Sequence, residues 1–196
     1  MTDHKTISVY DTQVDNYMDL VKRQPVDNSL LSFIARFKTG DYILDLGCGP
    51  AIASASMRER GLKVDPTDAS SKMVKLANEA FDIDARLAVF NDIKGSDIYD
   101  GVWASFSLLH ATREEFPGIL KALHEVLKPK GYFYLGMKIG VGSARDKFER
   151  YYSYYSEDEL HTYLANAGFT VENVELGEAK GLAGNSEPWI ALTSVA

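Results

Sequence analysis

Short apolar runs alternate with longer amphipathic stretches along most of the chain. Residues 42–46 and 99–105 have the length and composition of buried strands, whereas residues 112–127 repeat apolar positions at helical spacing. This alternation predicts an α/β fold with a mostly parallel sheet. The predicted strands are residues 42–46, 62–67, 86–90, 99–105, 132–137, 169–176 and 187–194, and the predicted helices are residues 10–22, 25–37, 51–60, 70–78, 112–127 and 156–167.

Polar residues mark where several of these helices begin. Ser70 is a predicted N-cap, because its hydroxyl can accept a hydrogen bond from the first turn. Thr112 with Glu115, and Ser156 with Glu159, have the spacing of capping boxes. These signals place three helix starts independently of the apolar pattern.

Composition narrows the class of protein. The 196 residues suffice for one well-buried domain, and we expect a single domain over residues 1–196. The net charge of −7 and the isoelectric point near 5.1 argue against a nucleic-acid partner. A single cysteine, the lack of an apolar leader and the lack of a bilayer-length apolar run favour a cytoplasmic protein with no membrane partner.

A glycine-bearing turn joins the first predicted strand to the helix that follows it. Residues 47–49 (Gly-Cys-Gly) come directly after the strand, and helix-tolerant residues continue from Ala51 to Arg60. Glycines let a ligand approach the backbone, and we expect exposed N–H groups at the start of the helix to attract electron-rich groups. The turn therefore predicts a site for a nucleotide-type ligand.

Two kinds of ligand compete for this turn. A dinucleotide fingerprint needs a small residue at its sixth position, counted from Gly47, where this chain has Ile52. Asp45 would repel a pyrophosphate, but it can accept hydrogen bonds from an ammonium group above the loop. The segment DLGCG thus resembles motif I of the class I S-adenosylmethionine-dependent methyltransferases. That family usually has a third glycine where this chain has Ala51, which is a mild departure.

An acidic residue follows the second predicted strand. Asp68 lies about 20 residues after the glycine turn, where a carboxylate grips a ribose diol in nucleotide-binding folds, although a turn or cap residue is the alternative. The segment DASSKM also resembles the methyltransferase pattern, which implies that Ala69, Ser70 and Met73 belong to the cofactor site. As a single apolar helix residue, Met73 is equally compatible with the core.

The third and fourth predicted strands end in further family-like segments. In the family, an acidic residue after the third strand meets the adenine amino group and the next N–H meets a ring nitrogen, which implies Asn91, Asp92 and Ile93 here. A loop aspartate is the alternative for Asp92. The fourth strand ends at Ser105, in the region that approaches the methionine end of the cofactor. The Asp/Asn-Pro-Pro-Tyr signature of methyltransferases that act on nucleic-acid bases or glutamine is absent.

Residues 1–24 contain a predicted lid helix. Tyr10 and Tyr17 lie on the apolar face of an amphipathic stretch over residues 10–22. Such a helix either closes an edge of the domain or, as in many small-molecule methyltransferases that the chain resembles, places aromatic rings over the methionine end of the cofactor.

His110 is the candidate catalytic residue. An imidazole near neutral pKa can take the proton of the acceptor as the methyl arrives. The alternative is a structural histidine that packs the start of the next helix. We favour the structural interpretation, because Leu-Leu-His occurs widely in the small-molecule members that this chain resembles, without a fixed catalytic role.

Residues 138–155 form a predicted acceptor-site loop that is basic and rich in tyrosine. Arg145 and Arg150 suit a carboxylate or phosphate, and Tyr151 suits the wall of a pocket. A solvated connection to the next helix is the alternative. The loop therefore predicts an anionic group on a small-molecule acceptor.

Together these segments identify the chain as a member of the class I methyltransferase family by resemblance. The resemblance implies a Rossmann-like fold with a seven-stranded, mostly parallel sheet, an antiparallel final strand and helices on both faces. It implies S-adenosylmethionine as cofactor, S-adenosylhomocysteine as product and a monomer or homodimer. The cofactor-binding residues that it implies are Tyr10, Tyr17, Asp45, Leu46, Gly47, Cys48, Gly49, Asp68, Ala69, Ser70, Met73, Asn91, Asp92, Ile93 and Ser105.

Two other functions stay open at this point. A NAD(P)-dependent oxidoreductase would share Asp68 but needs the missing glycine pattern. A non-catalytic nucleotide-binding module could use the same fold. The four histidines show no metal-ligand spacing, so we expect no metal.

Overall fold

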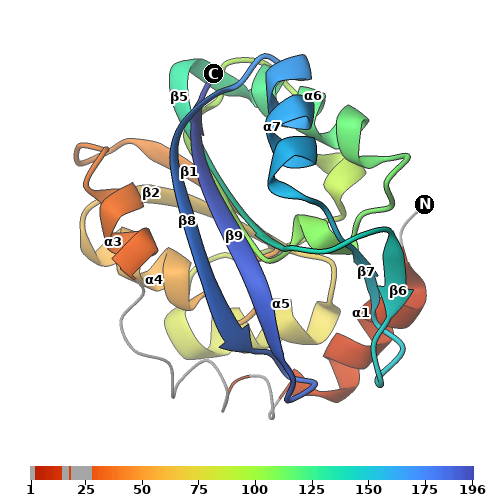
Figure 1. The fold of residues 1–196 in the computed structure, drawn as a ribbon. Helices are drawn as coiled ribbons and strands as arrows, with labels where there is room; N and C mark the ends of the chain where they lie inside the picture. The colour runs from red at the N-terminus through yellow and green to blue at the C-terminus, as the bar shows by residue number, and fades with distance from the viewer. Residues whose placement is uncertain (1–2, 15–17, 19–27) are drawn as a thin grey trace.

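The computed structural model describes residues 3–14, 18 and 28–196, and a twisted sheet forms its centre (Figure 1). The sheet has seven strands in the order β3-β2-β1-β4-β5-β9-β8. The first five strands of this order pair in parallel, and β9 is antiparallel to both β5 and β8. The strands are β1 (Tyr42–Leu46), β2 (Lys63–Asp68), β3 (Arg86–Leu87), β4 (Tyr99–Ser105), β5 (Leu127–Lys138), β8 (Thr170–Lys180) and β9 (Ser186–Val195). The predicted sheet, with its antiparallel final strand, is confirmed.

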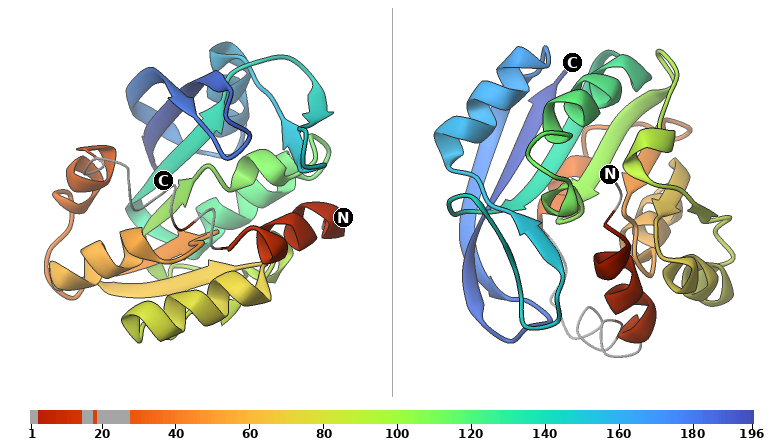
Figure 2. Two further views of the ribbon diagram at one scale, coloured as in Figure 1. Left: turned by 90° about the horizontal axis from the view of Figure 1, so that it is seen from below. Right: turned by 90° about the vertical axis from the view of Figure 1, so that its right-hand side faces the viewer.

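Helices cover both faces of the sheet, as two further views show (Figure 2). The helices α3 (Asn28–Ile34), α4 (Ile52–Glu59) and α5 (Ser71–Phe81) lie on one face, and α6 (Phe116–Val126) and α7 (Glu157–Asn166) lie on the other. Neighbouring residues of a strand point to opposite faces, so Ile43 packs with α3 and α4 whereas Leu44 packs with α6. Burial on both sides explains why β1 and β4 are mostly apolar. None of the described helices is long and apolar enough to cross a bilayer.

One of the two predicted capping boxes forms and the other does not. Ser156 and Glu159 form the complete box at the start of α7, as predicted. Thr112 Oγ1 does accept a hydrogen bond from the Glu115 N–H at 3.3 Å, but α6 begins only after Glu115. The Glu115 carboxylate bonds the Thr112 hydroxyl instead of a backbone N–H, so this pair closes the turn before the helix.

The third predicted strand is wrong beyond its first two residues. β3 ends at Leu87, and the 3-10 turn η1 (Phe90–Asp92) replaces the rest of the predicted strand. Asp92 Oδ2 accepts a hydrogen bond from the Val89 N–H at 3.0 Å, which turns the chain away from the sheet. Because β3 is an edge strand, the lost pairing leaves no gap inside the sheet.

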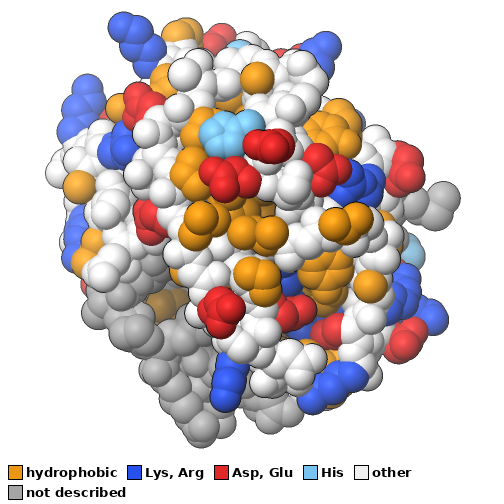
Figure 3. Space-filling view, in the orientation of Figure 1, with side chains coloured by type: hydrophobic (Ala, Val, Ile, Leu, Met, Phe, Trp, Pro, Cys, Tyr) orange, Lys and Arg blue, Asp and Glu red, His pale blue; other side chains and the backbone are white. Residues whose placement is uncertain are grey.

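The last two strands are longer than predicted. We expected a loop over residues 177–185, but β8 and β9 stay paired as far as Lys180 and Ser186. In the view of Figure 3, hydrophobic side chains lie among acidic ones on the face where β8 and β9 are in front. Glu172 and Glu175 of β8 bond Arg36 and Ser29, so two of its acidic side chains fasten the region of α3 to the sheet edge.

Two segments lie outside the main sheet and contact one another. The helix α1 (His4–Thr12) begins before Tyr10, earlier than predicted. The predicted acceptor-site loop over residues 138–155 contains a hairpin of β6 (Ser143–Arg145) and β7 (Tyr151–Ser153). This hairpin lies beside α1 (Figure 1).

Candidate functional site

A cavity opens at the carboxyl ends of β1, β2 and β4, where parallel α/β sheets bind ligands. The turn after β1, the start of α5, the segment around η1, the loop after β4 and the helix α1 all contribute to its walls. The predicted cofactor residues that line it are Tyr10, Leu46, Gly47, Gly49, Asp68, Ala69, Ser70, Met73, Asn91 and Ser105. The candidate catalytic residue His110 lines the same cavity. The fold thus gathers most of the predicted residues around one space.

The N–H groups of the glycine turn are used inside the protein. Gly47 and Cys48 both donate to the carbonyl of Thr67, at 2.8 Å each. Gly49 donates to Asp68 Oδ2, also at 2.8 Å. These three N–H groups are therefore not exposed donors, because β2 takes them. The turn instead offers the cavity a wall with no side chain at Gly47 and Gly49.

Asp45 lies beneath this turn and does not line the cavity. It is 2% exposed, and its Oδ2 accepts a hydrogen bond from Ser54 Oγ at 2.6 Å. Burial raises the pKa of Asp45 to about 7, with a smaller contribution from the charge of Asp68. A cation above the turn would favour the ionised form of Asp45. Cys48 is also buried outside the cavity wall, and burial raises the pKa of its thiol.

Asp68 joins two segments at the edge of the cavity. One carboxylate oxygen holds the Gly49 N–H, and the other accepts from the Ser70 N–H at 2.8 Å. Burial raises the pKa of Asp68, although both of these hydrogen bonds lower it. A carboxylate offers about four acceptor positions, so acceptor capacity remains for a hydroxyl of a ligand. Ser70 caps α5 as predicted, because its hydroxyl accepts from the Met73 N–H at 3.1 Å.

The segment predicted for the adenine contributes one of its three expected residues to the cavity. Asn91 lines the cavity, but Asp92 does not, since its carboxylate holds the Val89 N–H. The Ile93 N–H donates to the carbonyl of Phe90 at 3.3 Å, and Ile93 is 3% exposed. Val89 and Phe90 line the cavity beside Asn91.

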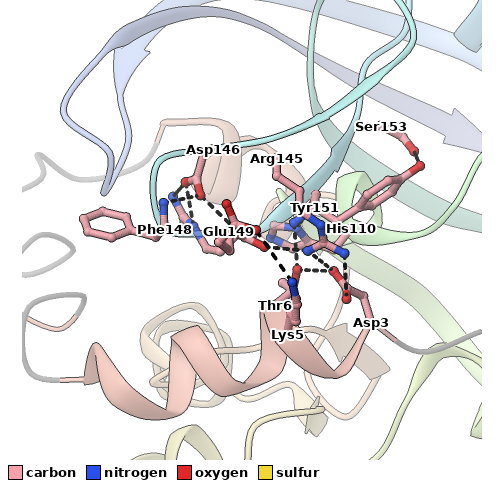
Figure 4. A network of polar contacts seen from close by, with 11 residues as sticks. Asp3, Lys5, Thr6, His110, Arg145, Asp146, Phe148, Glu149, Tyr151 and Ser153 are labelled. Carbon is pink, nitrogen blue, oxygen red and sulfur yellow. Dashed lines mark hydrogen bonds and ion pairs between the residues drawn. The ribbon is translucent and has the colours of Figure 1, made fainter.

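The helix α1 forms the opposite wall of the cavity and is fastened on two sides. The residues of α1 that line the cavity are Thr6, Ile7 and Tyr10, and Asp3, which precedes the helix, lines it too. Thr6 Oγ1 accepts a hydrogen bond from the Tyr151 N–H at 2.8 Å, which ties α1 to the β6–β7 hairpin (Figure 4). Asp11 accepts from Ser70 Oγ at 2.6 Å, which ties α1 to α5. Tyr17 lies outside the described residues.

Hydrogen bonds determine which nitrogen of His110 carries the proton. Nδ1 lies 2.6 Å from the Tyr151 carbonyl, which can only accept, so Nδ1 is protonated. Arg150 can only donate, and its Nη1 lies 3.1 Å from Tyr10 Oη. The Tyr10 hydroxyl is 2.8 Å from His110 Nε2 and is left to donate its proton there. Burial lowers the pKa of His110 to about 4, so the imidazole is neutral at pH 7 and its lone pair is occupied.

The three predicted acceptor residues do not line the cavity. Arg145 Nη1 bonds Asp3 Oδ2 at 3.0 Å on the surface of the hairpin. Arg150 is 3% exposed, and its Nε and Nη2 bond Asp146 Oδ2 at 2.9 and 2.6 Å. Tyr151 contributes its backbone N–H and carbonyl to the contacts with α1 and His110 (Figure 4). Both guanidinium groups are thus paired with carboxylates of the protein itself.

Several cavity residues were missed by the sequence analysis. Phe106 and Ser107 follow β4 in the segment that we had placed near the methionine end, so their position was predictable although their roles were not. Thr6 and Ile7 were missed because the helix was expected to begin at Tyr10. Within the described ranges, no three His, Cys, Asp or Glu side chains are grouped as a metal site would require.

Relatives of known sequence support a methyltransferase. Residues 21–174 match the methyltransferase domain family. An uncharacterized methyltransferase of Schizosaccharomyces pombe is 25% identical over 181 residues, which cover 80% of this chain and 65% of that protein. An uncharacterized methyltransferase of Staphylococcus carnosus is 24% identical over 161 residues, which cover 78% of this chain and 77% of that protein. The chain thus spans slightly less than two thirds of the fission yeast relative.

A solved structure shows the same fold. The 1,6-didemethyltoxoflavin-N1-methyltransferase of Burkholderia thailandensis, bound to its acceptor and S-adenosylhomocysteine, superposes with a TM-score of 0.79 at 19% identity. The superposition covers 97% of this chain and 87% of that one. With the family match over most of its length, the chain belongs to the class I S-adenosylmethionine-dependent methyltransferases, and S-adenosylmethionine is its cofactor.

Proposed function

We propose that this protein transfers the methyl group of S-adenosylmethionine to a small-molecule acceptor inside the cavity between the glycine turn and α1. The observation that carries this proposal is the pairing of the two walls. One wall presents Asp68 and the bare backbone of Gly47 and Gly49. The other wall is a helix that closes over the same space and is held by side-chain hydrogen bonds on both sides.

The residues of the first wall fit the cofactor. The remaining acceptor capacity of Asp68 would hold the ribose, and Asn91 with Val89 and Phe90 would border the adenine. Asp92 and Ile93 would not contact the adenine. Their hydrogen bonds would only stabilise the η1 turn beside it. The glycine turn would face the methionine end, with Asp45 beneath it as a counter-charge for the ammonium group. When bound, the cofactor supplies a methyl group already activated by the positively charged sulfur.

The acceptor end of the cavity favours a molecule without a strong negative charge. Phe106, Ala111 and Ile119 supply apolar surface there. An anionic group would have to displace Asp3 from Arg145 or Asp146 from Arg150, at the cost of breaking an existing ion pair. We therefore propose a small neutral acceptor in place of the anionic one that the arginines had indicated.

The chain contributes to the reaction chiefly by positioning and by excluding water. His110 is a poor general base in this arrangement, because Tyr10 occupies its lone pair and its pKa is lowered to about 4. The cavity would hold the acceptor and the methyl donor side by side, so that a bimolecular reaction becomes effectively unimolecular within the complex. A neutral nitrogen or sulfur nucleophile can attack the methyl group without prior deprotonation, and the cationic product of attack by an N–H nitrogen then loses its proton to solvent.

Isothermal titration calorimetry with S-adenosylhomocysteine and with NADH tests the proposal. We expect binding of the first and none of the second. Asp68→Ala should weaken S-adenosylhomocysteine binding at least about tenfold, because it removes the ribose contact and unfastens Gly49 and Ser70. Asp158→Ala, which removes an exposed carboxylate on α7, is the matched control and should not change the affinity. Equal affinity in the wild type and Asp68→Ala would refute the ribose assignment.

A further inference from the structure

The ionisable side chains in the cavity wall are mostly carboxylates. Asp3, Asp68 and Glu115 line the cavity, together with Tyr10 and His110, which bond one another. Among the described residues of this wall there is no Lys or Arg. Carboxylates on low-dielectric walls focus a negative potential into the space between them. The cavity should therefore favour groups that carry positive charge and disfavour anions.

Glu115 brings a carboxylate to the acceptor end of the cavity. It lies one helical turn before Ile119, whose N–H donates to the Glu115 carbonyl at 3.0 Å, so the two side chains share one side of α6. Glu115 Oε2 accepts a hydrogen bond from the Thr112 hydroxyl at 3.0 Å, which is a neutral donor. Asp3, by contrast, is paired with the guanidinium of Arg145. We therefore expect Glu115 to have the larger effect on a charge at the acceptor end.

The described wall offers no strong base to an acidic nucleophile. His110 Nε2 receives the Tyr10 hydroxyl at 2.8 Å, and Arg150 Nη1 holds that hydroxyl at 3.1 Å. The carboxylates of the wall are weak bases, because the ordinary pKa of a carboxyl is about 4, against about 8.5 for a thiol and about 10 for a phenol. A hydroxyl or thiol acceptor would have to lose its proton without help, and its anion would then lie among carboxylates.

We infer that the methyl group passes to an uncharged nitrogen of the acceptor and that the Glu115 carboxylate stabilises the positive charge that this nitrogen gains. This inference rests on the proposed function and names the atom that it leaves open. The nitrogen lone pair forms the new bond to the methyl carbon as the C–S bond breaks and its electron pair stays on the sulfur. The sulfur becomes neutral and the nitrogen becomes cationic. A nitrogen that carried an N–H then loses that proton to water or to the Glu115 carboxylate.

A carboxylate at the acceptor end favours a nitrogen over the other nucleophiles. Its attraction for positive charge grows as that charge moves from the sulfur to the nitrogen, so it stabilises the transition state more than the ground state. An anionic oxygen or sulfur would be repelled by the same carboxylate before it reached the methyl group. A thioether would also become cationic, but it has no N–H to donate to Glu115. An amine in its free-base form or an aromatic ring nitrogen meets both conditions.

Four analogues of S-adenosylhomocysteine test the inference by isothermal titration calorimetry. Each has a nitrogen in place of the sulfur, and this nitrogen carries a two-carbon arm in the direction in which the methyl group would leave. The arm ends in an amine, a hydroxyl, a methylthio group or a carboxylate. We expect the amine arm, which is protonated at pH 7 and so resembles the methylated nitrogen, to bind at least about tenfold more tightly than the hydroxyl and methylthio arms. The carboxylate arm should bind most weakly, because the wall repels it.

Glu115→Gln tests the assigned contact, since it keeps the size of the side chain and removes its charge. We expect the preference for the amine arm over the hydroxyl arm to fall from about tenfold to less than about threefold. This preference is a ratio of two affinities measured in one variant, so a general effect of the substitution on cofactor binding cancels. Glu114→Gln, which removes the neighbouring exposed carboxylate, is the matched control and should keep the wild-type ratio.

The possible results distinguish this inference from the proposed function. Equal affinity for the amine, hydroxyl and methylthio arms, or tightest binding of the carboxylate arm, overturns the inference and leaves the proposed function standing. The same holds if the wild type binds S-adenosylhomocysteine but none of the four analogues. An unchanged ratio in Glu115→Gln overturns the assignment to Glu115. If the wild type does not bind S-adenosylhomocysteine either, the proposed function fails first.

Discussion

The two walls of the cavity are built in different ways. In the first wall, the turn after β1 is bonded to the end of β2 mostly through backbone groups, with Asp68 as the main side-chain contributor. The second wall joins segments that are far apart in the chain, and it does so through side chains. Tyr10 contacts His110 and Arg150 at separations of 100 and 140 residues, and Thr6 contacts Tyr151 at 145.

This difference has a physical consequence for function. Backbone hydrogen bonds between neighbouring parallel strands form whenever the sheet forms, so the first wall is as stable as the core beside it. The second wall depends on a few polar contacts around α1, which can open without disturbing the sheet. We therefore expect the first wall to remain fixed while the second admits and releases ligands, as lids do in many enzymes.

Removal of the buried arginine should affect the second wall most. Arg150→Ala leaves Asp146 without its ion-pair partner and removes one hydrogen-bond donor to Tyr10, in a place where Arg150 is 3% exposed. We expect a loss of about 3 kcal/mol in the free energy of unfolding, measured by urea denaturation monitored by circular dichroism. This loss of free energy should exceed the loss caused by replacing an exposed arginine of the hairpin.

Arg145→Ala is the matched control for this prediction. Arg145 also forms an ion pair, with Asp3, but its side chain is 34% exposed and water screens the pair. We expect a loss of less than about 1 kcal/mol. If both variants lose the same free energy, the hairpin is not anchored at Arg150, and the contrast between a buried and an exposed pair is wrong.

The two walls should also respond to pH with opposite signs. The pKa of His110 is lowered from 6.5 to about 4 in the folded protein, so its contribution to stability is present above pH 6.5 and is lost as the pH falls through about 4. The pKa of Asp45 is raised from 3.8 to about 7, so its contribution is present below pH 3.8 and is lost as the pH rises through about 7. Melting temperatures between pH 4 and pH 8 check both signs.

Two non-titrating variants isolate these contributions from the other carboxylates. The wild type should lose melting temperature relative to His110→Gln as the pH is lowered from 6.5 to 4. The wild type should lose it relative to Asp45→Asn as the pH is raised from 3.8 to 7. If the difference in melting temperature between wild type and variant does not change with pH, the pKa of neither group is shifted by burial. If both differences change in the same direction with pH, the predicted opposite pH responses of the two walls are wrong.

The same contrast explains how much the sequence alone could predict. β1 and β4 were predicted to the residue, because short apolar runs between polar turns have one plausible structure. β3 was overextended, because residues 86–90 are apolar enough for a strand and only the side chain of Asp92 turns them away. Strand pairing could not be worked out from local pattern, which is why the ends of β8 and β9 were placed too early.

For the site residues too, the sequence predicted positions set by one local segment better than contacts between distant segments. Most of the predicted residues that line the cavity come from segments next to strand ends, where a motif fixes both position and neighbour. Arg145 and Arg150 were assigned to the acceptor because composition shows a charge but not its partner. Their partners, Asp3 and Asp146, become visible only when the hairpin and α1 are placed in space.

The smallest expected effect concerns Ala51, which stands where the family usually has its third glycine. Ala51 has a φ of +59° and is 0% exposed. Ala51→Gly would relieve about 1 kcal/mol of left-handed backbone strain and remove a buried methyl worth about 0.8 kcal/mol, so these two contributions nearly cancel. We expect the melting temperature to change by less than about 3 °C. Because Ala51 does not line the cavity, the affinity for S-adenosylhomocysteine should also stay the same. A severalfold gain in affinity would mean that the extra methyl holds the glycine turn away from the cofactor, and that the first wall is less rigid than its hydrogen bonds indicate.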